Sequence, residues 1–112
     1  MDNTGGLCAN PNDQLAEADC WLQTEIGPLV NYVIANGDLL ILAWDEGNGA
    51  DTTHGGGQVA TVLVGNLSKS GFQSTTFYQH QSTLRLMLQV LGITKFPGAA
   101  ASAPQMGEFF NP

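Results

Sequence analysis

The chain has 112 residues, enough for one small domain with a modest core. It carries 3 Lys and Arg against 10 Asp and Glu, and this formal net charge of −7 argues against binding nucleic acid or an anionic membrane through a basic patch. No apolar run approaches the roughly 20 residues of a membrane span, and the N-terminus lacks the basic and apolar segments of a signal peptide.

Residues 1–13 are expected to form an irregular lead-in, because Gly, Pro, Asn and Asp are frequent there. Asn12 or Asp13 is placed to cap a helix that follows. Cys8 and Cys20 are compatible with one disulfide in an exported protein or with two free thiols, and without a nearby His they make a poor zinc set.

From Gln14 to about Ala35, apolar residues recur at helical spacing, which predicts a helix. Gly27-Pro28 interrupts this pattern. Because proline lacks an N–H group and disfavours helix at the residue before it, we expect a kink or a break into two helices there. Asn36-Gly37 is a helix C-cap signal, and the apolar run that follows at once predicts a tight connection to a strand.

Two apolar runs, 39–44 and 59–65, predict strands. Both runs are continuous rather than alternating, which is typical of strands buried on both faces of a parallel sheet. The residues between them are polar and rich in glycine, so they predict a loop. Two helices and two such strands cannot close a sheet with both faces covered, and the predicted α/β fold is therefore a piece of a larger domain.

A second helix is predicted from Gln79 to Leu91, stopped by Gly92. Its apolar stripe is expected to comprise Leu84, Met87, Leu88 and Leu91. Arg85 lies on the polar side of this helix and is expected to pair with an acid. Residues 94–112 are expected to form an irregular tail, with Phe109 and Phe110 as docked apolar anchors.

The first candidate site lies where the first apolar run ends, at Asp45 and Glu46. Ligands of open α/β sheets bind outside the carboxyl ends of strands. Two adjacent like charges repel each other, so a divalent cation is a natural partner, whereas the alternative is a solvated acidic turn. His54, in the following loop, either joins the two carboxylates in a mixed oxygen and nitrogen site or is a solvated loop histidine.

Phosphate contacts are predicted at two further places. The N–H groups of the glycine run centred on Gly56 are able to face a phosphate, although a flexible connector is the alternative. His80 opens the second helix, where a helix N-terminus favours an anion, and the alternative is a surface histidine near a cap. No Ser-His-Asp set and no strand-to-helix nucleophile turn is present, so we expect no nucleophile within this chain.

Four motifs, in this order, resemble the C-terminal part of the phosphoesterase family, which contains bacterial acid phosphatases and phospholipase C enzymes. They are a strand ending in Trp-Asp-Glu (39–47), a Gly-rich loop with a Val-rich strand (54–65), a Lys-Ser-Gly turn (69–71) and a Tyr-Gln-His-x-Ser-x-Leu-Arg segment (78–85). Residues 18–22 also resemble the Gly-Asp-Ala-Trp-Leu helix of this family. The resemblance covers roughly residues 12–110.

This resemblance implies metal-dependent hydrolysis of phosphate esters on a partial three-layer α/β/α sheet of the alkaline-phosphatase-like type. Asp45 and Glu46 would then be metal-site residues of a divalent ion whose identity stays open. His54 stands where the wider superfamily often places a metal-binding histidine. His80 matches the family's histidine before Ser-x-Leu-Arg and would line or brace the site.

Two departures bear on this expectation. The family has a His-Asp pair near the position of Asn10-Pro11-Asn12-Asp13, where this chain has no histidine. The family's nucleophile and its Glu-Asn metal ligands lie far upstream of the matched region. Residues 1–112 are thus expected to be the C-terminal portion of a secreted or periplasmic phosphoesterase that needs the missing N-terminal part of its domain. The alternative is a non-catalytic remnant that binds a metal or a protein partner.

Overall fold

The computed structural model describes residues 8–9 and 12–112, so most of the predicted lead-in lies outside the described residues. The chain divides into two compact units, Met1–Asn66 and Leu67–Pro112. Helices and a small sheet occur together, which confirms a broadly α/β chain. None of the helices in the described part of the chain has the length and apolarity that crossing a bilayer demands.

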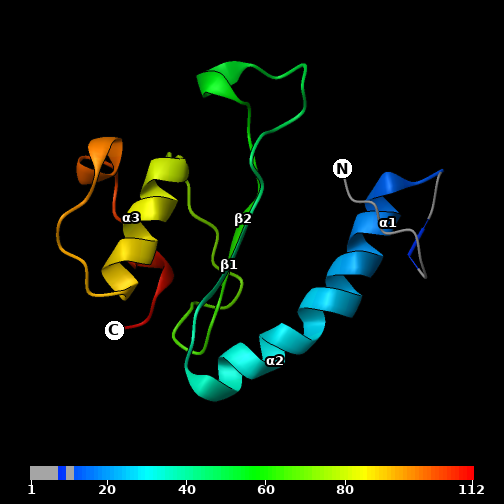
Figure 1. The fold of residues 1–112 in the computed structure, drawn as a ribbon, viewed down its shortest axis with the longest axis horizontal. Helices are drawn as coiled ribbons and strands as arrows, with labels where there is room; N and C mark the ends of the chain where they lie inside the picture. Colours follow the sequence, from blue (N-terminus) through cyan, green and yellow to red (C-terminus); the bar gives the residue numbers. More distant parts are fainter. Residues whose placement is uncertain (1–7, 10–11) are drawn as a thin grey trace. The chain divides into compact units, whose positions relative to one another are not determined.

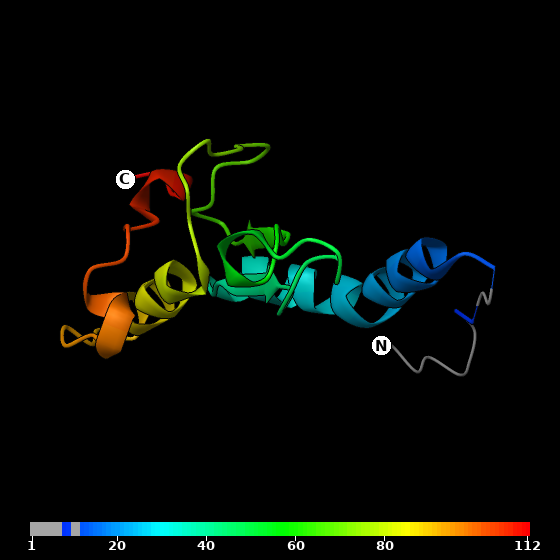
Figure 2. The same ribbon diagram turned by 90° about the horizontal axis from the view of Figure 1, so that it is seen from above.

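The first unit begins with a continuous helical path of three segments, α1 (Gln14–Trp21), the π-helical turn η1 (Leu22–Ile26) and α2 (Gly27–Asn36). Figures 1 and 2 show these segments running on without a loop between them. Asp13 caps α1, because its carboxylate accepts a hydrogen bond from the N–H of Ala16 at 3.0 Å. The predicted cap is therefore confirmed.

The predicted interruption at Gly27-Pro28 takes the form of the π-helical turn η1. Pro28 lies in the first turn of α2, where a missing N–H group costs least. The π-helical bond, from the N–H of Gly27 to the carbonyl of Leu22 five residues back, lies directly before the proline. The irregularity is thus where the sequence predicts it, while the chain stays helical through it.

Helix α2 ends where the C-cap signal Asn36-Gly37 predicts. Gly37 has a φ of 73°, in the left-handed region that favours glycine, and its N–H donates to the carbonyl of Val33. Asp38 N–H donates to the same carbonyl at 3.0 Å. The chain then enters strand β1 (Leu40–Ala43) almost at once, which confirms the tight helix-to-strand connection.

The sheet differs from the one that the sequence predicts. Strand β1 pairs with β2 (Thr61–Val64) in an antiparallel ladder, from Leu40 opposite Val64 to Ala43 opposite Thr61. No residue of either strand is fully buried, and Val62 is 45% exposed. The expectation of parallel strands buried on both faces is therefore wrong for the described residues, because a two-stranded ribbon has no second layer to cover each face. The three-layer sheet remains an expectation from the resemblance.

The second unit contains α3 (His80–Val90) and two 3-10 turns, η3 (Gly98–Ala101) and η4 (Gly107–Phe109). The turns lie in the tail that the sequence predicts to be irregular. In Figure 1, η3 (orange) lies beside α3 (yellow). The buried residues of this unit are Ser82, Leu86, Ala100 and Met106.

The buried face of α3 is not its predicted apolar stripe. Leu84, Met87 and Leu91 are 38%, 45% and 73% exposed, and only Leu88 of the predicted stripe is half-buried. Arg85 lies on the face of α3 that the tail covers. Its Nη1 donates to two main-chain carbonyls of the tail, those of Ala101 at 3.2 Å and Ala103 at 2.6 Å.

The expectation that Arg85 pairs with an acid is wrong, because its guanidinium bonds to these main-chain carbonyls instead. Its guanidinium also lies 4.9 Å from the ring centroid of Phe96, so a cation–π contact adds to the two hydrogen bonds. Planar guanidinium groups combine hydrogen bonding with stacking in this way. Arg85 thus fastens the tail to α3.

The C-terminal aromatic residues dock as predicted. The ring of Phe109 meets the ring of Phe72 edge to face, with centroids 5.4 Å apart, and lies 5.8 Å from the ring of Tyr78. Phe110 forms an isolated antiparallel bridge with Ser68. The tail is thereby held to the segment that precedes α3.

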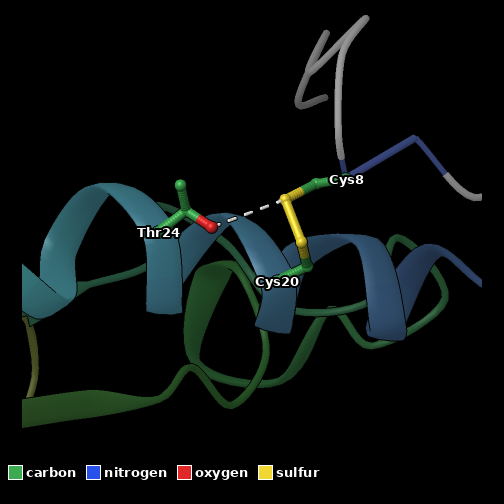
Figure 3. Close-up of a disulfide and its surroundings, with 3 residues drawn as sticks. All are labelled: Cys8, Cys20 and Thr24. Carbon is green, nitrogen blue, oxygen red and sulfur yellow. Dashed lines mark hydrogen bonds between the residues drawn. A yellow bond between two sulfur atoms is a disulfide. The ribbon is translucent and has the colours of Figure 1, made fainter.

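Cys8 and Cys20 form a disulfide, with Cα atoms 5.5 Å apart (Figure 3). This resolves the two possibilities that the sequence leaves open. The bond ties the segment before α1 to the helix itself. The hydroxyl of Thr24, one turn further along, lies 3.8 Å from the sulfur of Cys8.

Replacing both Cys8 and Cys20 with Ser should lower the free energy of unfolding of the first unit by about 3 kcal/mol, because the bond constrains a short loop of the unfolded chain. Both tryptophans lie in this unit, so tryptophan fluorescence during guanidinium unfolding measures the effect. The oxidised and the reduced wild-type protein form the matched pair. Equal unfolding midpoints for these two would contradict the prediction.

Candidate functional site

The candidate site is the loop that joins β1 to β2, residues 45–58, called the hairpin loop below. Pairing continues just beyond the strands, since the N–H of Trp44 donates to the carbonyl of Ala60 at 3.3 Å. Asp45 and Glu46 follow and are exposed. The carboxylate of Asp45 accepts the N–H of Glu46 at 3.0 Å, which orients one of its oxygens toward the backbone.

The two sides of the hairpin loop are joined close to these carboxylates. The N–H of Gly47 donates to the carbonyl of Gly56 at 2.6 Å. A Cβ atom at Gly47 would lie only 2.9 Å from the carbonyl oxygen and 3.1 Å from the nitrogen of Gln58. Glycine is therefore required at position 47 for the returning backbone to pass beside the acidic pair.

Asp51, which the sequence marks only weakly as a candidate, organises the middle of the hairpin loop. Its Oδ1 accepts the N–H of Thr53 at 3.0 Å and the hydroxyl of Thr53 at 2.6 Å, while Oδ2 accepts the N–H of Gln58 at 3.2 Å. These bonds to Thr53 and Gln58, with a smaller contribution from the charge of His54, lower the pKa of the Asp51 carboxyl below its usual value of 3.8.

A weak sequence signal for this arrangement exists. An aspartate whose carboxylate bonds to the backbone two residues further on is a common turn signature, and Asp51-Thr52-Thr53 fits it. The bond from Oδ2 to Gln58 has no such signal, because it depends on where the returning chain lies.

His54 lies in the 3-10 turn η2 (Thr53–Gly55) of the hairpin loop. Its φ of 54° is in the left-handed region, which non-glycine residues adopt at a cost, and such residues occur often at functional sites. Its side chain is exposed. Asp45, Glu46, His54 and Gly56 are thus all carried by one loop, as the sequence predicts from their spacing.

The N–H groups of the glycine run are engaged inside the hairpin loop. Gly55 donates to the carbonyl of Thr52 at 3.3 Å, and both Gly56 and Gly57 donate to that of Thr53, at 3.3 and 2.9 Å. A phosphate at Gly56 would compete with these carbonyls. The phosphate contact at Gly56 therefore stays a prediction.

Within residues 8–9 and 12–112, no group of three or more His, Cys, Asp or Glu side chains is placed to hold a metal ion. The donors of the hairpin loop are chemically suited to a divalent cation, because they are carboxylate oxygens and an imidazole nitrogen. They do not make a complete site by themselves in the described structure. The assignment of Asp45, Glu46 and His54 as ligands accordingly stays a prediction.

His80 belongs to the second unit, where it is the first residue of α3. It is exposed, and Gln79, before it, caps the helix without a side-chain hydrogen bond. These features agree with the predicted position at a helix N-terminus. Its proposed contact with phosphate is not tested by them.

The second unit holds a further polar cluster that the sequence did not reveal. The carboxylate of Glu108 accepts hydrogen bonds from the hydroxyls of Ser74 and Tyr78, the latter at 2.7 Å. The bond from Ser74, followed by that from Tyr78, lowers the pKa of Glu108 below 4.5. Burial, followed by the bond to Glu108, raises the pKa of Tyr78 above 10.0. The cluster joins the tail to the segment before α3.

The pKa of Glu108 is lowered in the folded chain, so its contribution to stability is present above about 4.5 and is lost as the pH falls through the lowered value. We expect protection of the Asn111 amide, which bonds to the carbonyl of Leu67, to weaken on acidification. Glu108→Gln should remove most of this pH dependence. Hydrogen exchange, corrected for intrinsic rates, measures it.

Glu17→Gln, in the first unit, is the matched control and should leave the pH dependence of Asn111 protection as in the wild type. An unchanged pH dependence in Glu108→Gln would show that another group is responsible.

No family model matches this chain, and no solved structure matches it. The chain is similar to phosphatidylinositol-3-phosphatase of Mycobacterium tuberculosis, with 28% identity over 97 residues. The alignment covers 87% of this chain but 30% of the relative, so the chain spans less than a third of that protein's length. The hairpin loop and its carboxylates thus belong to a chain that has a phosphatase among its distant homologues.

Proposed function

We propose that this chain takes part in the hydrolysis of phosphate esters, as a portion of a phosphatase of the phosphoesterase type. The single observation that carries the proposal is the similarity to a phosphatase over 87% of the chain. The hairpin loop supports it, because it presents two adjacent, exposed carboxylates and a histidine at one end of a strand pair.

In this proposal, Asp45 and Glu46 face a divalent cation, and His54 adds a nitrogen donor to the same region. The backbone of Gly56, in the first unit, and His80, in the second, are each proposed as a phosphate contact. A bound cation would polarise the phosphoryl oxygens and relieve the repulsion between the two carboxylates. The described residues hold no group of three or more such side chains placed for a metal ion. By the resemblance to the phosphoesterase family, the remaining ligands and the nucleophile would come from upstream of the matched region.

The disulfide supports the proposed location. Disulfides persist in oxidising compartments and are rare in the cytosol. The Cys8–Cys20 bond therefore favours a secreted or periplasmic protein.

The proposal covers two classes of substrate. Acid phosphatases hydrolyse monoesters at acidic pH, and phospholipase C enzymes hydrolyse lipid phosphodiesters.

The test is release of p-nitrophenol from p-nitrophenyl phosphate by the full-length protein that contains these residues. Activity that is lost with a chelator and restored by a divalent metal is the expected result. p-Nitrophenylphosphorylcholine, assayed in parallel across acidic and neutral pH, distinguishes monoester from diester hydrolysis. No release from either ester, with or without added metal, would overturn the proposal and favour a non-catalytic remnant.

A further inference from the structure

The carboxylate of Asp51 spans the hairpin loop rather than capping a single turn. One oxygen bonds to Thr53, two residues ahead, and the other bonds to the N–H of Gln58, on the returning side of the loop. Asp51 is only partly exposed, whereas Asp45 and Glu46 are exposed. Its two oxygens are thus already occupied by donors of the chain itself, unlike those of a carboxylate that is open to a ligand.

Close packing fixes the place of this carboxylate. Gly57 has a φ of 75°, and a Cβ atom there would lie 2.9 Å from both Cγ and Oδ2 of Asp51. The loop backbone therefore approaches Asp51 as closely as a glycine permits. A small displacement of Asp51 would move the peptide between Gly57 and Gln58.

The backbone of Gln58 also passes close to Gly47, the residue that follows the acidic pair. The backbone of Gln58 is held by Asp51 on one side and passes Gly47 on the other, at distances that a Cβ atom at Gly47 would not allow. The Gly47 N–H bond to Gly56, at 2.6 Å, joins the same two sides. Gly47 directly follows Glu46 in the chain, so these contacts lead from Asp51 through Gln58 to the residue next to the acidic pair.

We propose that Asp51 is a positioning residue, which holds the returning side of the hairpin loop against Gly47 and so fixes the direction in which Asp45 and Glu46 are presented. This inference rests on the proposed function for the roles of Asp45 and Glu46. Asp51 itself touches neither substrate nor cation in this scheme. It acts through Gln58 and Gly47.

The first experiment needs no enzymatic activity. In Asp51→Asn of the 112-residue chain, the amide replaces the oxygen that accepts the Gln58 N–H, and the exchange of the Gly47 amide with water should become about tenfold faster. Asp38→Asn, which removes the same charge from an exposed residue of the same unit, is the control and should leave this rate unchanged. If amide exchange became faster only at Thr53 and Gln58, while the Gly47 amide exchanged at the wild-type rate, the proposal would be overturned.

The second experiment measures kcat and KM of the full-length protein at a temperature where each variant is fully folded. Substitutions behind a ligand residue typically cost about 10- to 100-fold in activity, and we expect such a fall in kcat for Asp51→Asn but not for Asp38→Asn. Thr53→Val, which removes one donor to Asp51, should lower kcat, whereas Thr53→Ser, which keeps the hydroxyl, should restore it.

The two experiments separate the two proposals. An active protein whose Asp51→Asn variant matches Asp38→Asn in kcat would refute the role of Asp51 and leave the proposed function standing. A protein without phosphatase activity would refute the proposed function, and the exchange rate of Gly47 would still decide whether Asp51 holds the loop.

Discussion

Replacing Asp45 with Asn in the full-length protein should lower phosphate release by about 100-fold or more. Substitution of groups that merely support a metal ligand costs about 10- to 100-fold, so loss of a ligand itself should cost at least as much. Asparagine keeps the oxygen that accepts the Glu46 N–H at 3.0 Å, so the local backbone is preserved. The expected loss of activity therefore measures the effect of removing the negative charge.

Activity on p-nitrophenyl phosphate and metal content by elemental analysis should be measured on the same preparations. Asp45→Asn should lower both, and Asp38→Asn should lower neither. Near-normal turnover of Asp45→Asn with ordinary metal content would remove Asp45 from the site. The similarity to a phosphatase would then describe ancestry alone.

The second large effect is on stability, and it concerns Leu86 on α3. This side chain is 5% exposed, whereas Leu91, the residue that caps the C-terminus of α3, is 73% exposed. Leu86→Ala should lower the free energy of opening of the second unit by about 2–5 kcal/mol, because the lost burial is joined by the cost of a cavity. Leu91→Ala should change it by about 0.5 kcal/mol or less.

Hydrogen exchange of the α3 amides under native conditions measures both variants on the same residues. The comparison distinguishes the observed packing from the packing that the sequence pattern predicts, in which Leu91 is part of the buried stripe. A larger loss for Leu91→Ala than for Leu86→Ala would contradict the observed burial.

Local chemistry explains why much of the fold could be predicted. Asp13 caps its helix, Gly37 ends α2 in a left-handed conformation, and the two apolar runs form the two strands. Each of these outcomes depends on residues that are neighbours along the chain. Even the irregularity before Pro28 follows from the proline's missing N–H, although the π-helical form that it takes does not.

The candidate site also has a part that the local sequence predicts and a part that it does not. The grouping of Asp45, Glu46 and His54 in one loop follows from their spacing between two strands. The role of Asp51 does not, because its bond to Gln58 joins residues on opposite sides of the loop. Likewise, nothing local to Glu108 indicates that Ser74 and Tyr78 will donate to it.

The sequence by itself determined where the helices and strands lie, which residues end them and which acids share a loop with His54. Only the tertiary structure decided the antiparallel pairing of β1 with β2, the disulfide between Cys8 and Cys20, and the burial of Leu86 in place of Leu91. The physical reason is that propensity and capping act between near neighbours, whereas pairing, cross-linking and burial depend on which distant segment arrives at each surface.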